Sequence, residues 1–249
     1  MQKRKKKDNI DYILRDWRYD PDAVSVRMVK GEDGRDLIQM RIEMGLLQLE
    51  TSGRPDGERP EGAISYFDYL TQKSHTEGGS FVFSEDDCAE VDREFVQFYH
   101  RRVCWLAMRE FDKAVKDADH TLGLMDLCKE HSPDEDWTLA HEQYRPFVMF
   151  HRIQAAALAK LDEAGPEAAV QIVNQGLDNL REVFAEFETE VDFEEQEMVM
   201  RLVEFRETLR EKFEVGRTLQ EQLQDAIAAE EYELAAEIRD LLRKQKTHL

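Results

Sequence analysis

The feature that most constrains this chain is the helical periodicity of its apolar residues, which runs from Ser84 almost to the C-terminus. Apolar side chains recur there every three or four residues, a spacing that places them along one face of an α-helix. Short polar breaks divide the stretch into expected helices at 84–108, 110–131, 134–163, 166–187 and 192–214, then a pair at 218–246. Helices joined by short loops pack as antiparallel neighbours. The sequence therefore predicts a mainly α fold built on an antiparallel helical bundle.

Two residues mark expected helix starts, and a third marks an expected kink. Ser84 is a predicted N-cap, because three acidic residues follow it in the first turn, where the helix dipole favours negative charge. Pro166 suits the first turn of the fourth helix. Pro146 lies inside the third expected helix and predicts a kink there.

The N-terminal part has a different period. Val24, Val26 and Met28 alternate with polar residues, and after a "GEDG" turn signal the alternation resumes from Ile38 to Met44. Period-two alternation is typical of half-buried strands. The phase slips by one at Gly45, which indicates a bulge or bend. We expect a small N-terminal β hairpin of two or three antiparallel strands, followed by a short helix within 63–75.

The organisation expected from these patterns has four segments. They are a basic disordered tail at 1–10, a small α+β segment with the β hairpin at 11–80, a helical repeat-like body at 84–214 and the closing helical pair at 218–246.

Part of the body resembles a tetratricopeptide repeat. The segment "WLAMREFDKAVKDADHTLGL" places Trp105 on one helix and Phe111, Ala114 and Ala118 on the next, as in the middle of such a repeat. "IQAAALAKLDEAGPEAAVQIVNQGL" is a looser second match. Ala114 and Ala169 are 55 residues apart, against about 34 in a standard repeat. Tetratricopeptide-like packing and a plain helical bundle both remain open.

The charge distribution restricts the partners. The formal net charge is −20, so most of the surface should repel nucleic acid and anionic membranes. The basic run at residues 3–7 is the exception, and with Arg54 and Arg59 in a Pro- and Gly-rich loop it is where phosphate could bind. No secretion signal or membrane span is evident, and three scattered cysteines form no disulfide framework or zinc pair. We expect a cytoplasmic location.

No catalytic motif is found. His120, Cys128 and His131 lie within twelve residues, but three ligands without a fourth make a weak metal site. "HEQYR" begins like a zinc-protease box but has Arg145 where the second histidine should be. We therefore expect no catalytic residue, no metal and no cofactor.

The closing helical pair carries the most specific pattern. Leu219, Leu223 and Ala226 lie on one helical face, and "EYELAAEIRD" follows, with an adjacent stripe of Leu234, Ile238 and Leu241. About thirty residues without metal or disulfide are too few to stabilise themselves. Their apolar stripes must be covered by the rest of the chain, by a second copy or by another protein.

These residues resemble the UVR motif, the helical hairpin of the excision-repair proteins UvrB and UvrC, also found in Clp-type ATPases. The resemblance rests on the leucine-spaced first helix, the Glu-Tyr-Glu, the paired alanines and the Arg-Asp. It implies a docking hairpin that joins proteins to one another, in a repair or proteolysis context. The helicase, nuclease and ATPase motifs of those proteins are missing here.

The resemblance predicts a non-enzymatic adaptor or scaffold that binds a protein partner, or a second copy, through 218–246, with UvrB/UvrC-type or Clp-type proteins as candidate partners. The expected partner-binding residues are Leu219, Leu223, Ala226, Tyr232, Ala235, Ala236, Arg239, Asp240 and Leu242. Two alternatives remain open. One is a nucleic-acid accessory protein that binds through its basic arm, and the other is an enzyme with a site in the helical groove.

Overall fold

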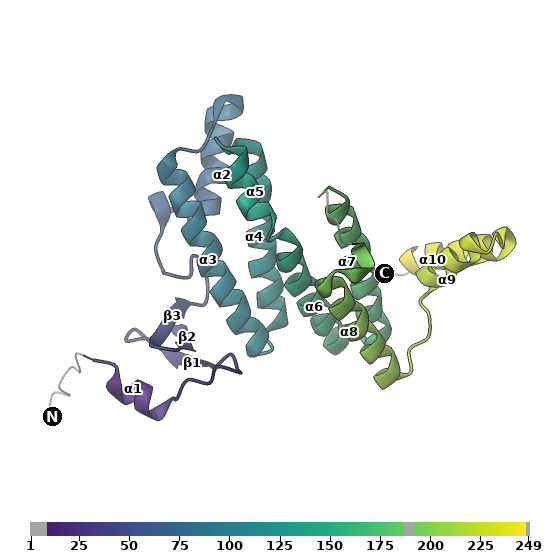
Figure 1. Cartoon of the computed structure of the whole chain (residues 1–249), viewed down its shortest axis with the longest axis horizontal. Helices are drawn as coiled ribbons and strands as arrows, with labels where there is room; N and C mark the ends of the chain where they lie inside the picture. Colours follow the sequence, from purple (N-terminus) through teal and green to yellow (C-terminus); the bar gives the residue numbers. More distant parts are fainter. Residues whose placement is uncertain (1–8, 187–191, 248–249) are drawn as a thin grey trace. The chain divides into compact units, whose positions relative to one another are not determined.

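The computed structural model describes residues 9–186 and 192–247, so the expected basic tail at 1–10 lies almost entirely outside the described residues. The chain forms two compact units, Met1–Ala155 and Ala156–Leu249, and α6 spans the boundary between them (Figure 1). The elements in chain order are α1 (Asp11–Asp16), β1 (Val26–Lys30), β2 (Asp36–Ile42), β3 (Gly45–Glu50), η1 (Pro60–Gly62), α2 (Tyr66–Glu77), η2 (Gly78–Ser80), α3 (Glu85–Ala107), α4 (Phe111–His131), α5 (Glu135–Glu142), α6 (Arg145–Ala164), α7 (Pro166–Glu186), η3 (Phe193–Glu195), α8 (Glu197–Phe213), α9 (Leu219–Ala228) and α10 (Tyr232–Thr247). The predicted mainly α class is confirmed.

The N-terminal strands form an antiparallel sheet in the order β1-β2-β3. Ile38 is fully buried and pairs with Leu49, so this face of the sheet is the apolar one. The other face is polar: Gln39 accepts hydrogen bonds from Arg27 and donates one to Gln48 across all three strands. The strand was predicted, but it is not half-buried as expected, because Gln39 and Arg41 of the polar face are each only 7% exposed.

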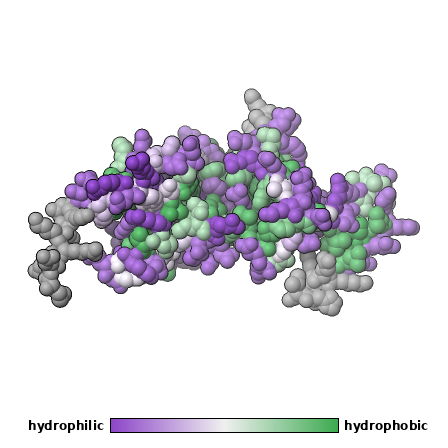
Figure 2. Space-filling view, turned by 90° about the horizontal axis from the view of Figure 1, so that it is seen from below, coloured by the Kyte–Doolittle hydropathy of each residue, from purple (hydrophilic) through white to green (hydrophobic). Residues whose placement is uncertain are grey.

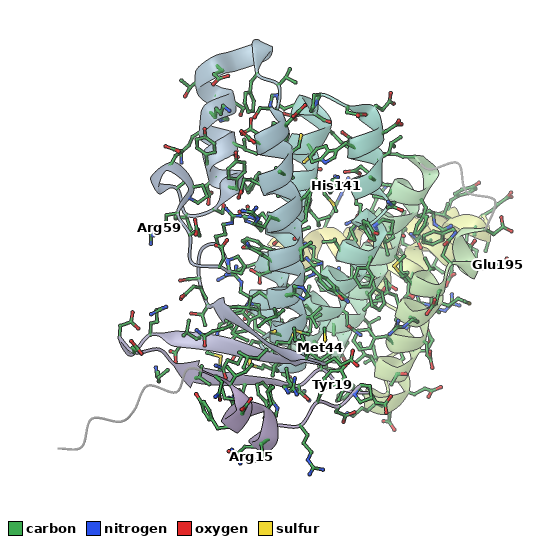
Figure 3. All side chains as sticks on the ribbon, turned by 60° about the vertical axis from the view of Figure 1, so that its left-hand side comes forward. Arg15, Tyr19, Met44, Arg59, His141 and Glu195 are labelled. Atoms are coloured by element: carbon green, nitrogen blue, oxygen red, sulfur yellow. The ribbon has the colours of Figure 1, made fainter. Side chains whose placement is uncertain are left out.

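The end of β2 differs from the prediction. Ile42 ends the strand, and Met44, expected to continue it, lies in the turn to β3 with 89% of its surface exposed (Figure 3). Gly45 begins β3 and pairs with Ile42, so the phase slip marks a reversal of the chain and not a bulge. The guanidinium of Arg41 holds this turn, since its Nη1 donates to the carbonyl of Gly45 over 2.7 Å.

The first unit is built around α3 and α4, which lie side by side (Figure 1). Ser84 caps α3 as predicted: its hydroxyl accepts from the Asp87 N–H, and the Asp87 carboxylate accepts from the Ser84 N–H. The helix α2 packs on both long helices, and the ring of Phe67 lies so close to Gly123 that an added Cβ would come within 3.0 Å of it.

A buried carboxylate fixes the start of α2. Glu94 has no exposed surface, and its oxygens accept from the N–H groups of Tyr66 and Phe67 over 2.7 and 3.0 Å. These N–H groups have no partner within α2, because the first turn of a helix leaves its donors free. Glu94 also lies 2.8 Å from Nε2 of His120, whose ring stacks on Phe98 at 3.6 Å.

The third expected helix is two helices. The chain turns at Gln143 and Tyr144, which separate α5 from α6, and Pro146 is the second residue of α6 instead of a kink within one helix. Proline is tolerated there because first-turn N–H groups need no helical partner. His141 near the end of α5 contacts the Trp137 ring and lies 2.9 Å from Asp92 of α3 (Figure 3).

The second unit packs α7 against α8 and the end of α6. Ala169, Val170 and Leu209 are buried there, with Leu161 and Val215 beside them. The helix expected to start at 192 begins at Glu197, after the short turn η3. It ends in a left-handed residue, Glu214, and the Val215 N–H donates back to the Arg210 carbonyl.

The buried positions of Trp105, Phe111, Ala114 and Ala118 agree with the helical pair that was predicted for α3 and α4. Their assignment to a tetratricopeptide-like repeat stays a prediction, as do the four expected domain segments. Every helix in 9–186 and 192–247 is too short or too polar to span a lipid bilayer.

Candidate protein-interaction site

The candidate site is the C-terminal hairpin of α9 and α10, which lie side by side (Figure 1). A capping box starts α9: the Thr218 hydroxyl accepts from the Glu221 N–H, and the Glu221 carboxylate accepts from the Thr218 N–H over 2.8 Å. Glu221 also bonds Arg210 of α8. The side chain of Glu221 thus ties the start of the hairpin to the preceding helix.

The turn of the hairpin has a defined geometry. Glu230 adopts a left-handed conformation with φ 60°, and the Glu231 N–H donates to the Ala226 carbonyl over 2.8 Å. This 6→1 bond with a left-handed residue before it is a Schellman motif, which stops α9 and reverses the chain. The acidic residues Glu230, Glu231 and Glu233 then lie at the N-terminus of α10, where the helix dipole favours them.

The hairpin has its own small interior. Ala226, Ala235 and Ile238 are buried at the seam between the helices, and Leu219, Leu223 and Leu242 are packed against them in part. The two alanines allow α9 and α10 to approach closely. Five of the predicted partner-binding residues, Leu219, Leu223, Ala226, Ala235 and Leu242, thus contact one another inside the hairpin.

Larger apolar side chains are left on the outside of the hairpin. Leu234 and Leu241 of α10 are 44% and 48% exposed. They are seven residues apart, or two helical turns, and so lie on one face. Ile227 and Tyr232, on either side of the turn, are 53% and 67% exposed. In the space-filling view, hydrophobic residues gather over the hairpin (Figure 2). We call Ile227, Tyr232, Leu234 and Leu241 the outer apolar residues.

The other predicted residues of the hairpin are polar or half-buried. Tyr232, Arg239 and Asp240 are exposed, and Ala236 is half-buried. The Nε of Arg239 lies 3.7 Å from the carboxylate of its neighbour Asp240. Arg239 also lines a cleft of about 430 Å³ between the hairpin and α7, opposite Gln171 and Asp178.

The residues considered for a metal site are separate in the structure. His120 bonds Glu94, Cys128 is buried in the core around α2 and α4, and His131 Nδ1 lies 3.1 Å from the Phe81 carbonyl. Across the described part of the chain, no group of three or more His, Cys, Asp or Glu side chains is placed to hold a metal ion. Burial raises the pKa of Cys104 to about 12, so this thiol is not a nucleophile at neutral pH.

The loop arginines differ from each other. Arg54 was one of the residues expected to reach phosphate, but it is 3% exposed and its guanidinium bonds Glu90 over 2.7 Å. Its charge is compensated inside the protein, and Asp56 lies 3.3 Å away as well. Arg54 is therefore not available to a nucleic acid, whereas Arg59 is exposed (Figure 3).

A buried helical seam with apolar side chains left outside defines the class of protein: one that carries a C-terminal helical hairpin with an uncovered apolar surface. Comparison with known protein families agrees with this, because residues 215–246 match the profile of the UvrB/uvrC motif, UVR. The chain thus contains a UVR motif, as the resemblance predicted. No curated protein and no solved structure gave a significant match.

The outer apolar residues were visible in the sequence but were not assigned to the partner surface, apart from Tyr232. The signal was the heptad spacing of Leu234 and Leu241, next to the alanine pair at 235–236. The sequence alone does not tell which side of α10 packs against α9, and so which apolar residues of α10 are buried between the helices. In the structure Ala226 of α9 packs with Ala235 and Ile238, which places Leu234 and Leu241 outside. The partner-binding roles of these residues stay predictions.

Proposed function

We propose that this protein is a non-enzymatic adaptor of the cytoplasm, and that its C-terminal hairpin docks on another hairpin of the UVR type. The single observation that carries the proposal is the exposure of Leu234 and Leu241 on a hairpin whose seam is already filled by Ala226, Ala235 and Ile238. The partner is a UVR hairpin of a UvrB/UvrC-type protein, of a Clp-type protein or of a second copy, which would bury the same apolar face.

The contribution of docking to the binding free energy follows from the exposed fractions of Leu234 and Leu241. Fully burying a leucine side chain is worth about 1.5–3 kcal/mol. Leu234 and Leu241 are 44% and 48% exposed, so about half of that value is still available from each. Docking both should contribute roughly 1.5–3 kcal/mol, or about 10- to 150-fold in Kd.

The test is the double variant Leu234→Glu with Leu241→Glu in the full chain. Its binding to immobilised wild-type chain, to purified UvrB, to purified UvrC and to a purified Clp-type ATPase that carries a UVR motif is compared with that of wild type by surface plasmon resonance. The matched control is Glu233→Gln with Glu237→Gln, which changes two exposed positions of the same helix without adding charge. Far-UV circular dichroism confirms that helix content is retained.

We expect wild type and control to bind at least one of these proteins with equal affinity, and the double variant to bind at least tenfold more weakly. If wild type binds none of the four, or if the double variant binds as tightly as the control, docking through this face is wrong. A repair or proteolysis context follows from which of the proteins binds.

A further inference from the structure

Two neighbouring arginines of α3 point into the first unit. Arg101 and Arg102 are 4% and 1% exposed. Arg101 has a full set of partners: its Nε and Nη2 bond both oxygens of the Asp117 carboxylate over 2.9 and 2.8 Å, and its Nη1 donates to the Gly53 carbonyl over 2.7 Å. The charge of Arg101 is compensated by this bidentate ion pair with Asp117.

Arg102 has no such compensation. Its Nη1 donates to the Thr121 hydroxyl over 3.0 Å, and its Nε lies 3.4 Å from Nδ1 of His151. Neither acceptor is a carboxylate. Burial lowers the pKa of Arg102 to about 10, and the nearby charge of Asp117 opposes this only in part. Two cations thus share one carboxylate, and the interior around Asp117 keeps a net positive charge.

One nitrogen of Arg102 is left for a ligand. Within residues 9–186 and 192–247, its Nη2 has no hydrogen-bond partner, and it is not among the fully enclosed polar atoms that lack one. It therefore keeps a trace of accessible surface. A buried guanidinium without a counter-ion is costly, and a stable fold would gain from its replacement by an apolar side chain.

Aromatic rings lie close to this guanidinium. The Cζ of Arg102 lies 6.0 Å from the centre of the Tyr99 ring, which is 39% exposed. The Phe147 ring lies 6.3 Å from Tyr99 and 4.3 Å from His151. Val96, one turn before Tyr99 on α3, is 56% exposed. The site thus combines an unpaired cation with an apolar rim.

We propose that Arg102 is the receptor for a carboxylate of a bound peptide, whose neighbouring apolar side chain packs on Tyr99 and Phe147. A carboxylate fits the guanidinium through a charge-assisted hydrogen bond. A phosphate would carry about two charges toward a chain of net charge −20 and would be repelled more strongly. The carboxylate belongs either to an acidic side chain or to a C-terminus, and both present the same chemistry.

The experiment measures binding of small probes to the full chain by isothermal titration calorimetry. N-acetyl-phenylalanine presents a terminal carboxylate, and N-acetyl-glutamyl-phenylalanine amide presents a side-chain carboxylate. N-acetyl-phenylalanine amide is the neutral control, and inorganic phosphate tests a different anion. We expect at least one carboxylate probe to bind tenfold or more tightly than the neutral amide and than phosphate. The carboxylate probe that binds more tightly shows whether the site prefers a C-terminal or a side-chain carboxylate.

The matched variants are Arg102→Met, Arg102→Lys and the exposed Arg93→Met of the same helix. Arg102→Met should lose carboxylate binding at least tenfold while its urea midpoint equals or exceeds that of wild type. Arg102→Lys should bind with intermediate affinity, and Arg93→Met should bind as wild type.

Three results would overturn the proposal. One is equal affinity for carboxylate and amide probes, or for phosphate. Another is unchanged binding in Arg102→Met. The third is a wild type that binds no probe while Arg102→Met is destabilised, which would make Arg102 a structural residue.

Discussion

Replacement of Glu94 by glutamine should strongly destabilise the first unit. The carboxylate accepts from two N–H groups that α2 cannot satisfy, at 2.7 Å from Tyr66 and 3.0 Å from Phe67. Hydrogen bonds to charged groups contribute about 1.5–3 kcal/mol each, and an unsatisfied buried donor costs about 1–3 kcal/mol. The amide oxygen of glutamine can serve one donor, but its NH₂ group then faces the other. We expect a loss of about 4 kcal/mol.

The assay is urea unfolding of the full chain followed by tryptophan fluorescence. All three tryptophans, Trp17, Trp105 and Trp137, lie in the first unit, so the signal is specific to it. With a urea slope of about 2 kcal/mol per M, a loss of 4 kcal/mol lowers the midpoint by about 2 M. Glu85→Gln, an exposed change on the same helix, is the control and should shift the midpoint little.

A Glu94→Gln midpoint within about 0.5 M of the control would refute this reasoning. It would mean that the N–H groups of α2 find other acceptors, such as water, at little cost. The hydrogen bonds from the start of α2 to the Glu94 carboxylate would then not stabilise the fold.

Three further predictions concern the hairpin and the capping box of α3. Replacing Glu230, at φ 60°, by glycine should remove about 1 kcal/mol of left-handed strain and slow amide exchange in α10 about fivefold. Ala235→Leu should force the hairpin seam apart at a cost of about 1–3 kcal/mol, and exchange there should accelerate. Burial opposes ionisation of Asp87, but hydrogen bonds, first that from Tyr66, outweigh it and hold the pKa of Asp87 below its ordinary value. The stability it contributes should therefore be complete above about pH 4 and lost as the pH falls further, and Asp87→Asn should flatten that dependence of the fluorescence midpoint.

The helices could be predicted from the sequence because their ends are marked locally. Ser84 with Asp87 forms the capping box of α3, and Pro166 begins α7. Two other local features led to wrong predictions, because each is compatible with two different structures. A glycine at a phase slip fits a bulge as well as a turn, and only the pairing of Gly45 with Ile42 distinguishes them. Pro146 likewise fits both a kink and a helix start.

The buried charges could not be predicted. Glu94, Arg101 and Arg102 read as solvated residues on an otherwise amphipathic helix, because charged side chains are rarely fully buried. Each is enclosed through partners distant in sequence: Glu94 by the start of α2, Arg101 by Asp117 of α4. A pattern along one helix contains no information about such partners.

The hairpin shows why a match to a docking motif is informative only when its seam is known. Ala226 and Ala235 bring α9 and α10 close, and Ile238 with the half-buried Leu219, Leu223 and Leu242 completes the seam. The side chains of Leu234 and Leu241 would add to this burial if they lay inside, yet they lie half exposed outside it. This distribution leaves part of the hairpin's apolar surface where only another surface can cover it. An uncovered outer face favours a hairpin that gains further stability on association, which is what docking requires.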